Sequence, residues 1–160
     1  ILIADVSERE LMALRAAGAA APGPLSALAG VIGTFAARSL QNRRLTWALI
    51  AEPVDGATDA ARQRYRRALA SEIEARIRAA IEGGHLPDQD ATLSASVLVG
   101  ALLEGLVGPL APDGIDDPAR MREAAQTLAL FALRGLGVVD ARARGLVVQM
   151  ALPAAAGGAA

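Results

Sequence analysis

The sequence has no cysteine, and this absence excludes disulfide bonds and thiolate metal sites. It has a single histidine, His85, so metal sites and acid–base dyads that need two histidines are excluded as well. Aromatic residues make up only 2% of the 160 residues, namely Phe35, Trp47, Tyr65 and Phe131. A core of Ala, Leu, Val and Ile with so few aromatic or β-branched runs favours helices over sheets.

Neither positive nor negative charge dominates, because the formal net charge is −1. The sequence also has no lysine, so every basic side chain other than His85 is an arginine. DNA-binding modules usually present a basic face, and this balance argues against nucleic-acid binding by these residues alone. Long hydrophobic runs are also missing, since residues 97–103 fall far short of the ~20 residues that span a bilayer. With no visible signal peptide, we expect a cytoplasmic protein without a membrane partner.

Hydrophobic periodicity predicts an all-α bundle of about six helices. The expected ranges are 1–17, 24–40, 43–51, 58–82, 91–110 and 118–136. Residues 138–150 either continue as a helix or lie against the body, and 152–160 form a low-complexity Pro/Ala/Gly tail with little reason to fold. We therefore expect one helical domain over 1–137, followed by an extension and tail over 138–160.

Local signals define the helix ends. Pro24 and Pro118 suit the first turn of a helix, and Asp117 is a predicted N-cap. Pro53 ends the third helix, and residues 53–56 are predicted to form a turn. The Gly83-Gly84 pair is expected to stop the fourth helix, whose Glu72–Arg76 and Glu74–Arg78 pairs have the i,i+4 spacing of stabilising ion pairs.

The fifth predicted helix is apolar around nearly its whole circumference. A helix of this kind is expected to be buried on all sides. Its small and polar residues form a row at four-residue spacing: Ser96, Gly100, Glu104 and Gly108. Such a row allows another backbone to approach closely.

Four features in this order resemble the C-terminal region of regulators of the tetracycline-repressor (TetR) family. They are the short helix ending in residues 44–55, the long amphipathic fourth helix, the break at 83–87 before the apolar helix that ends at 108–110, and the Asp117-Pro118 helix that closes at 133–137. The similarity spans residues 1–137, and the order and lengths of the helices carry it.

The resemblance implies a helical body that dimerises and binds a small effector, next to an N-terminal helix-turn-helix head. No such head is present among these residues, and Ile1 opens the chain in mid-pattern without a Met. We therefore expect the natural N-terminus to lie upstream, and operator DNA to be a partner only through the missing head. A small effector would then release the operator allosterically by changing the spacing of two heads.

The resemblance to TetR regulators implies an effector cavity among the first five helices. Its candidate lining residues are Phe35, Trp47, Ile50, Tyr65, Leu69, Val99, Leu103 and Glu104. Trp47 is the best candidate because it lies on a short helix beside a proline break. The alternative, that Trp47 is an ordinary core side chain, has equal support. For Phe35 and Tyr65 core packing is the simpler explanation. The aliphatic lining indicates a small hydrophobic or aromatic effector, with no cofactor and no metal.

Glu104 is a carboxylate within an apolar helix, which is costly unless the group is paired or protonated. It either orients a polar group of the effector, meets an Arg across a dimer, or faces solvent at a groove. The resemblance also implies that the last two long helices pair with a second copy in a four-helix bundle. The candidate dimer residues are Leu102, Leu106, Leu110, Leu128, Phe131 and Ala132, with burial in the monomer core as the alternative.

Other polar residues are interpreted more simply. His85 is expected to be a solvated loop histidine, and Arg62, Arg64, Arg66 and Arg67 a solvated helix face. An enzyme is disfavoured because the chain has no Gly-rich phosphate loop after a strand and no carboxylate pair set in an apolar pocket. The alternative function is a stand-alone, dimeric helical scaffold that binds protein and no small molecule.

Overall fold

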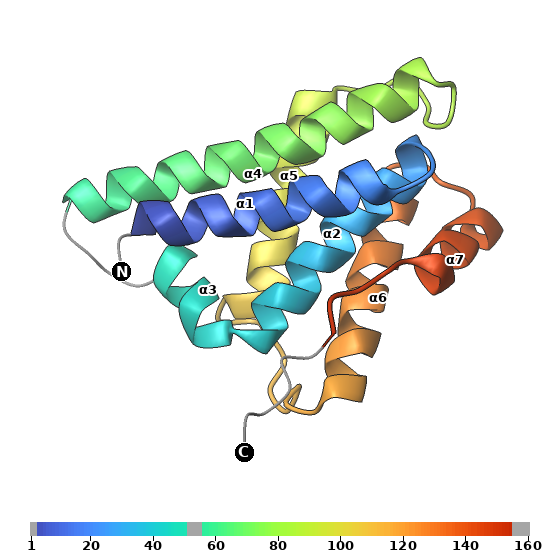
Figure 1. The fold of residues 1–160 in the computed structure, drawn as a ribbon. Helices are drawn as coiled ribbons and strands as arrows, with labels where there is room; N and C mark the ends of the chain where they lie inside the picture. The colour runs from blue at the N-terminus through green and yellow to red at the C-terminus, as the bar shows by residue number, and fades with distance from the viewer. Residues whose placement is uncertain (1–2, 51–55, 155–160) are drawn as a thin grey trace.

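A computed structural model describes residues 3–50 and 56–154, and the described part of the chain is all α-helical, with seven helices and no strand (Figure 1). They are α1 (Ile3–Ala20), α2 (Pro24–Gln41), α3 (Arg43–Ile50), α4 (Gly56–Glu82), α5 (Ala91–Val107), α6 (Pro118–Gly135) and α7 (Asp140–Gln149). The all-α prediction is confirmed. The turn expected at Pro53–Gly56 lies, up to residue 55, outside the described residues.

The predicted helix ends follow the local chemistry closely. Pro24 and Pro118 occupy the first turns of α2 and α6, and Asp117 Oδ1 accepts the backbone N–H groups of Ala119 and Arg120. Helix α5 begins at Ala91 as predicted, and Asp90 caps it by accepting the N–H of Leu93 at 2.9 Å. Each such cap is worth about 1 kcal/mol.

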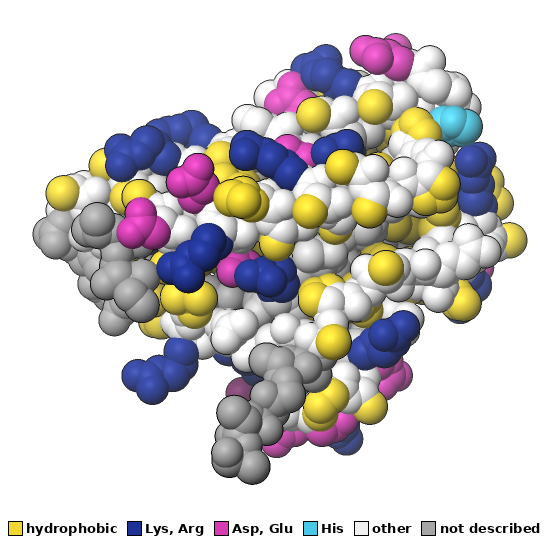
Figure 2. Space-filling view, in the orientation of Figure 1, with side chains coloured by type: hydrophobic (Ala, Val, Ile, Leu, Met, Phe, Trp, Pro, Cys, Tyr) yellow, Lys and Arg dark blue, Asp and Glu magenta, His cyan; other side chains and the backbone are white. Residues whose placement is uncertain are grey.

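Helices α1 and α4 lie side by side and run in the same direction across one face of the molecule (Figure 1). Arg15 of α1 pairs with Glu72 of α4, and one turn further along both helices Gly18 contacts Arg76. The predicted i,i+4 pairs on α4 are formed as well, with Arg76 and Arg78 bound to the carboxylates four residues before them. Figure 2 shows basic and acidic side chains interspersed over this face.

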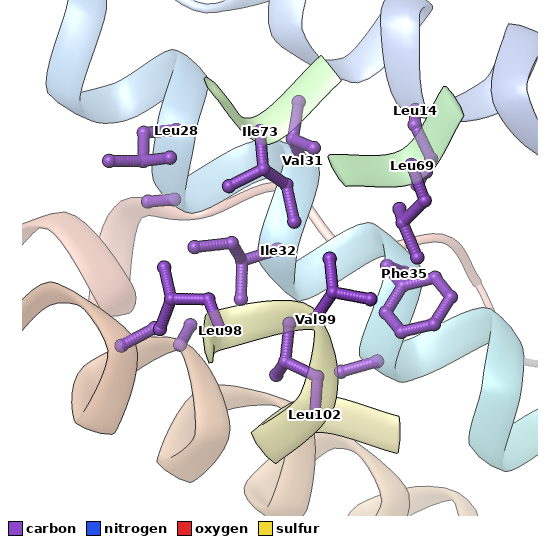
Figure 3. Close-up of a cluster of buried hydrophobic side chains, with 14 of the residues drawn as sticks. Leu14, Leu28, Val31, Ile32, Phe35, Leu69, Ile73, Leu98, Val99 and Leu102 are labelled. Atoms are coloured by element: carbon purple, nitrogen blue, oxygen red, sulfur yellow. The ribbon is translucent and has the colours of Figure 1, made fainter. Parts of the chain in front are cut away.

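The helix buried on all sides is α2, not α5 as the sequence predicted. It contacts every other helix, and most of its side chains are inaccessible to solvent. Small residues make this possible, because Gly30 allows the carbonyl of Ala17 on α1 to approach closely. One cluster around α2 collects large side chains from α1, α4 and α5 (Figure 3). Helix α5, by contrast, leaves Leu93 and Val97 exposed to solvent.

Residues beyond 137 pack on the same body. Residues 138–150 were predicted either to continue as a helix or to lie against the body, and they do both. Helix α7 contacts α6 and α2, and Ala143, Val147 and Met150 belong to the core cluster. The chain then runs back along α2, where Gln41 Nε2 donates to the carbonyls of Pro153 and Ala154 at 3.4 Å. The predicted tail is therefore attached at its start, and its residues after 154 lie outside the described part.

One of the four arginines predicted to form a solvated face is in fact buried. Arg62 is 4% exposed, and its guanidinium donates a hydrogen bond to the carbonyl of Ala48 in the last turn of α3. Arg64 and Arg67 are exposed as predicted, and Arg66 is half-buried. The periodicity of α4 did not reveal this, because it does not show how the preceding helix α3 packs back against α4 in the folded chain. No helix in the described ranges is long and apolar enough to cross a membrane.

Candidate functional site

Six of the eight candidate effector residues meet in the buried cluster. Phe35 comes from α2, Ile50 from α3, Tyr65 and Leu69 from α4, and Val99 and Leu103 from α5, and each is less than a tenth exposed. Figure 3 shows Phe35, Leu69 and Val99 within this cluster. The tertiary structure thus brings together side chains from four helices, as an effector site requires. The same burial is what an ordinary hydrophobic core requires.

Trp47 and Glu104 do not join this cluster. Trp47 is 43% exposed and lines an open surface hollow of about 860 Å³, with α3 on one side and the loop after α5 on the other. Arg43 reaches from α3 to the last turn of α5 and to this loop, where it donates to the carbonyls of Leu106 and Pro112. Trp47 therefore belongs to a separate, solvent-open feature at the end of the bundle.

Glu104 has a local structural role. Its Oε1 accepts the backbone N–H of Leu110 at 3.0 Å, and its carboxylate lies against Gly108, which has no side chain to obstruct it. The carboxylate thereby orders the chain that leaves α5. This interaction explains the four-residue spacing of Glu104 and Gly108 that the sequence analysis singled out.

A polar cluster that the sequence analysis missed lies beside the buried candidates. Arg38 of α2 binds Glu10 of α1 in a bidentate pair, with both N–O distances at 2.7 Å. The hydrogen bonds to Glu10 raise the pKa of the Arg38 guanidinium. Tyr65 of α4 lies close enough that burial, followed by the charge of Glu10, raises the pKa of its phenol well above the ordinary value. No sequence signal links these residues, because they come from three different helices.

The candidate dimer residues fall into two groups. Leu102, Leu106 and Ala132 are buried within this chain, at 2%, 1% and 0% exposure, so they have no surface to offer a second copy. Phe131 is 60% and Leu110 80% exposed, and Leu128 is half-buried against Gly105 of α5. The alternative prediction, burial in the core of the monomer, therefore applies only to Leu102, Leu106 and Ala132.

The outer face of α5 carries two exposed apolar residues that were not among the candidate dimer residues. Leu93 and Val97 are each 61% exposed, and Gly100, one turn further along, has no atoms within 4 Å of where a Cβ would be. Their signal was present in the sequence as an apolar circumference. The sequence analysis predicted from it that α5 is buried on all sides, whereas the folded monomer covers only part of the helix.

Remaining predictions concern ionisable groups. His85 lies in the loop after α4 and is exposed as predicted, with its Nδ1 3.3 Å from a guanidinium nitrogen of Arg142 on α7. Within residues 3–50 and 56–154, no three His, Asp or Glu side chains are grouped in a way that would hold a metal ion.

Two solved structures have this arrangement of helices. The crystal structure of RolR (NCGL1110) in complex with the ligand resorcinol matches 96% of this chain and 70% of its own, with a TM-score of 0.71 and 22% identity. The chain shares its fold with RolR. RolR without ligand matches the same share of this chain and 72% of its own, with a TM-score of 0.67 and 21% identity. No family model matches the sequence. No curated protein sequence matches it either.

Proposed function

We propose that this chain is the effector-sensing and dimerisation part of a TetR-type transcriptional regulator. The observation that carries the proposal is the fold shared with RolR, which has been crystallised with a small aromatic ligand. The order of helices that resembles TetR regulators in the sequence is independent support. The closed apolar cluster among α2–α5 is additional support, because small-molecule sites are mostly apolar with a few polar groups.

The effector in this proposal is a small hydrophobic or aromatic molecule that binds among Phe35, Ile50, Tyr65, Leu69, Val99 and Leu103. These side chains fill the space between four helices in the structure described here. A ring that enters between them must move at least one helix, and a ligand shifts an equilibrium only by its differential affinity for the two states. If the core opens when the effector binds, binding of the effector would therefore cause a helix to move.

The second part of the proposal is a homodimer formed through the outer faces of α5 and α6. Leu93 and Val97 on α5 and Phe131 on α6 are large apolar side chains in solvent, and Leu110 follows α5. Leu93 and Val97 lie one turn apart on the same face of α5, and exposed apolar patches of this kind mark interaction sites. Gly100 and the exposed Gly135, which both lack contacts at their Cβ positions, leave room for a second backbone.

Operator DNA would be bound by a helix-turn-helix head outside these residues, and binding of the effector would release it. Two heads in a dimer must be spaced by about 34–36 Å to enter successive major grooves. A movement of α1–α5 by a few ångströms would alter this spacing. Effector and DNA would then weaken each other's binding reciprocally, by about 1–3 kcal/mol.

The test is ligand-dependent stability of the 160-residue chain, measured by thermal unfolding with resorcinol and a panel of small aromatic and aliphatic compounds. A ligand at one hundred times its Kd stabilises the folded state by about 2.7 kcal/mol. For a domain of this size that corresponds to a rise in Tm of roughly 5–10 °C. If no compound in the panel raises the Tm, while the chain is a dimer in solution, the sensor is ruled out and the scaffold alternative is favoured.

A further inference from the structure

We infer that the Ser7–Glu10–Arg38–Tyr65 cluster is the polar end of the effector site, and that the effector is an uncharged aromatic compound carrying a hydroxyl group. This inference rests on the proposed function, because it assigns the chemical class of ligand to the sensor site. It goes beyond the apolar candidates from the sequence, which do not distinguish a hydrocarbon from a phenol.

The cluster is built at one end of three packed helices. Arg38 joins α2 to α1 through its bidentate pair with Glu10. Helices α1 and α4 run in parallel with Arg15 beside Glu72 and Gly18 beside Arg76. Continued towards the N-termini, the same register places Ser7 level with Tyr65. Ser7 and Glu10 are three residues apart, so they lie on the same face of α1.

The hydroxyl of Ser7 is the observation that indicates a ligand. Ser7 is 8% exposed, and its Oγ is buried without a hydrogen-bond partner among the described residues. A buried hydroxyl with no partner is destabilising, and such groups are uncommon in folded proteins. A ligand that donates to or accepts from this oxygen would remove that cost.

Glu10 determines the charge of the ligand. Its carboxylate is only 16% exposed and accepts two hydrogen bonds from Arg38, and a carboxylate has about four lone-pair sites. It can therefore accept an additional O–H from a ligand. Arg38 already balances the charge of Glu10, so a neutral ligand with a hydrogen-bond donor fits the pair without adding a buried charge that has no counter-ion.

The apolar side of the site specifies a small ring. Phe35 lies one turn before Arg38 on α2, and Leu69 lies one turn after Tyr65 on α4, and both are buried in the cluster that Figure 3 shows. A ring between these side chains would place a ring hydroxyl towards Ser7 and Glu10. An aliphatic alcohol would meet the same polar end without the contacts that Phe35 and Leu69 offer to an aromatic face.

An ordinary ion pair does not explain the whole cluster. The desolvation cost of a partly buried pair offsets much of its attraction, so the Glu10–Arg38 pair by itself adds little to stability. It also leaves the Ser7 hydroxyl without a function. A polar end that binds a ligand hydroxyl accounts for both the partly buried Glu10–Arg38 pair and the unpaired Ser7 hydroxyl.

The experiment compares phenol with toluene, which has nearly the same shape but no hydroxyl, by titration calorimetry on the full chain. The variants are Ser7→Ala and Glu10→Gln, with Glu74→Gln as the control, because Glu74 forms a similar pair with Arg78 on the surface of α4. Phenol is expected to bind the wild type at least about tenfold more tightly than toluene, as hydroxyl-recognising sites do. Ser7→Ala should weaken phenol about three- to tenfold and Glu10→Gln about tenfold or more, each with toluene unchanged.

Ser7→Ala separates this role from a structural one. Removal of an unpaired buried hydroxyl should leave the Tm of the free chain unchanged or raised, so weaker phenol binding in this variant cannot be attributed to misfolding. Phenol binding that is equal in wild type and Ser7→Ala, or equal for phenol and toluene, overturns the inference but leaves an aromatic sensor intact. If resorcinol and the rest of the wider panel also fail to raise the Tm, the proposed function fails together with it.

Discussion

The thioether of Met150 lies against the backbone of Gly33, in the space where any other residue would place its Cβ. Met150 is the first residue after α7, and Gly33 is in the middle of the central helix α2. The contact therefore joins the C-terminal segment to the core at a position where glycine leaves room for the Met150 side chain. It also explains how the extension after residue 137 lies against the body, which was one of the two possibilities that the sequence left open.

Gly33→Ala is expected to destabilise the chain by about 1–3 kcal/mol, because the added methyl group overpacks against Met150 and Leu152. The measurement is the free energy of unfolding in urea. The control is Gly145→Ala on α7, where a Cβ meets no atom within 4 Å. This control should gain roughly 0.5–1 kcal/mol from helix propensity, and equal stability of Gly33→Ala and wild type would contradict the packing described here.

Arg62→Ala is expected to cost roughly 1–3 kcal/mol, because it removes a buried guanidinium and leaves the half-buried carbonyl of Ala48 without its donor. Arg64→Ala, two residues along the same helix, removes an exposed guanidinium and should change the free energy of unfolding by no more than about 0.5 kcal/mol. Both values come from chemical denaturation followed by circular dichroism. Similar losses in the two variants would show that α3 does not cover Arg62 in solution.

Val97→Glu is expected to convert a dimer into a monomer, because a charge on the outer face of α5 would be buried against the second copy. Val148→Glu on α7 is the matched control, since Val148 is also exposed and lies outside the proposed interface. Sedimentation velocity at micromolar concentration distinguishes the two states. A wild-type chain that sediments as a monomer removes the dimer from the proposed function.

Tyr65 is the only tyrosine, so its ionisation can be followed by absorbance at alkaline pH. Burial raises the pKa of this phenol above its ordinary value of about 10. The neutral form is therefore favoured in the folded state, and its contribution to stability is complete below about pH 10 and is lost as the pH rises above that value.

In the native chain the phenol is expected to ionise only as the helices unfold, whereas in urea it should titrate near pH 10. Absorbance and circular dichroism recorded on the same samples test this. Titration near pH 10 with the helical signal intact would place Tyr65 in solvent. Tyr65→Phe should remove this part of the alkaline loss of stability.

Much of the fold was predictable because helix signals are local. Asp117, Pro118 and Pro24 act within one turn of chain, and their predicted roles are those observed. The site was only partly predictable. Phe35 and Leu69 were recognised as apolar candidates. The Glu10–Arg38 pair was missed, because it joins two different helices.

The sequence by itself determined the helical class, the helix boundaries and the apolar side chains that form a core, because periodicity, caps and propensity act between residues a few positions apart. Only the tertiary structure decided which helix is central. Both α2 and α5 are apolar, and the small residues Gly30 and Gly33 allow neighbours to surround α2, while α5 keeps an exposed face. The same holds for buried Arg62 and for the Ser7–Glu10–Arg38–Tyr65 cluster, because burial and pairing depend on helices that meet only when the chain folds.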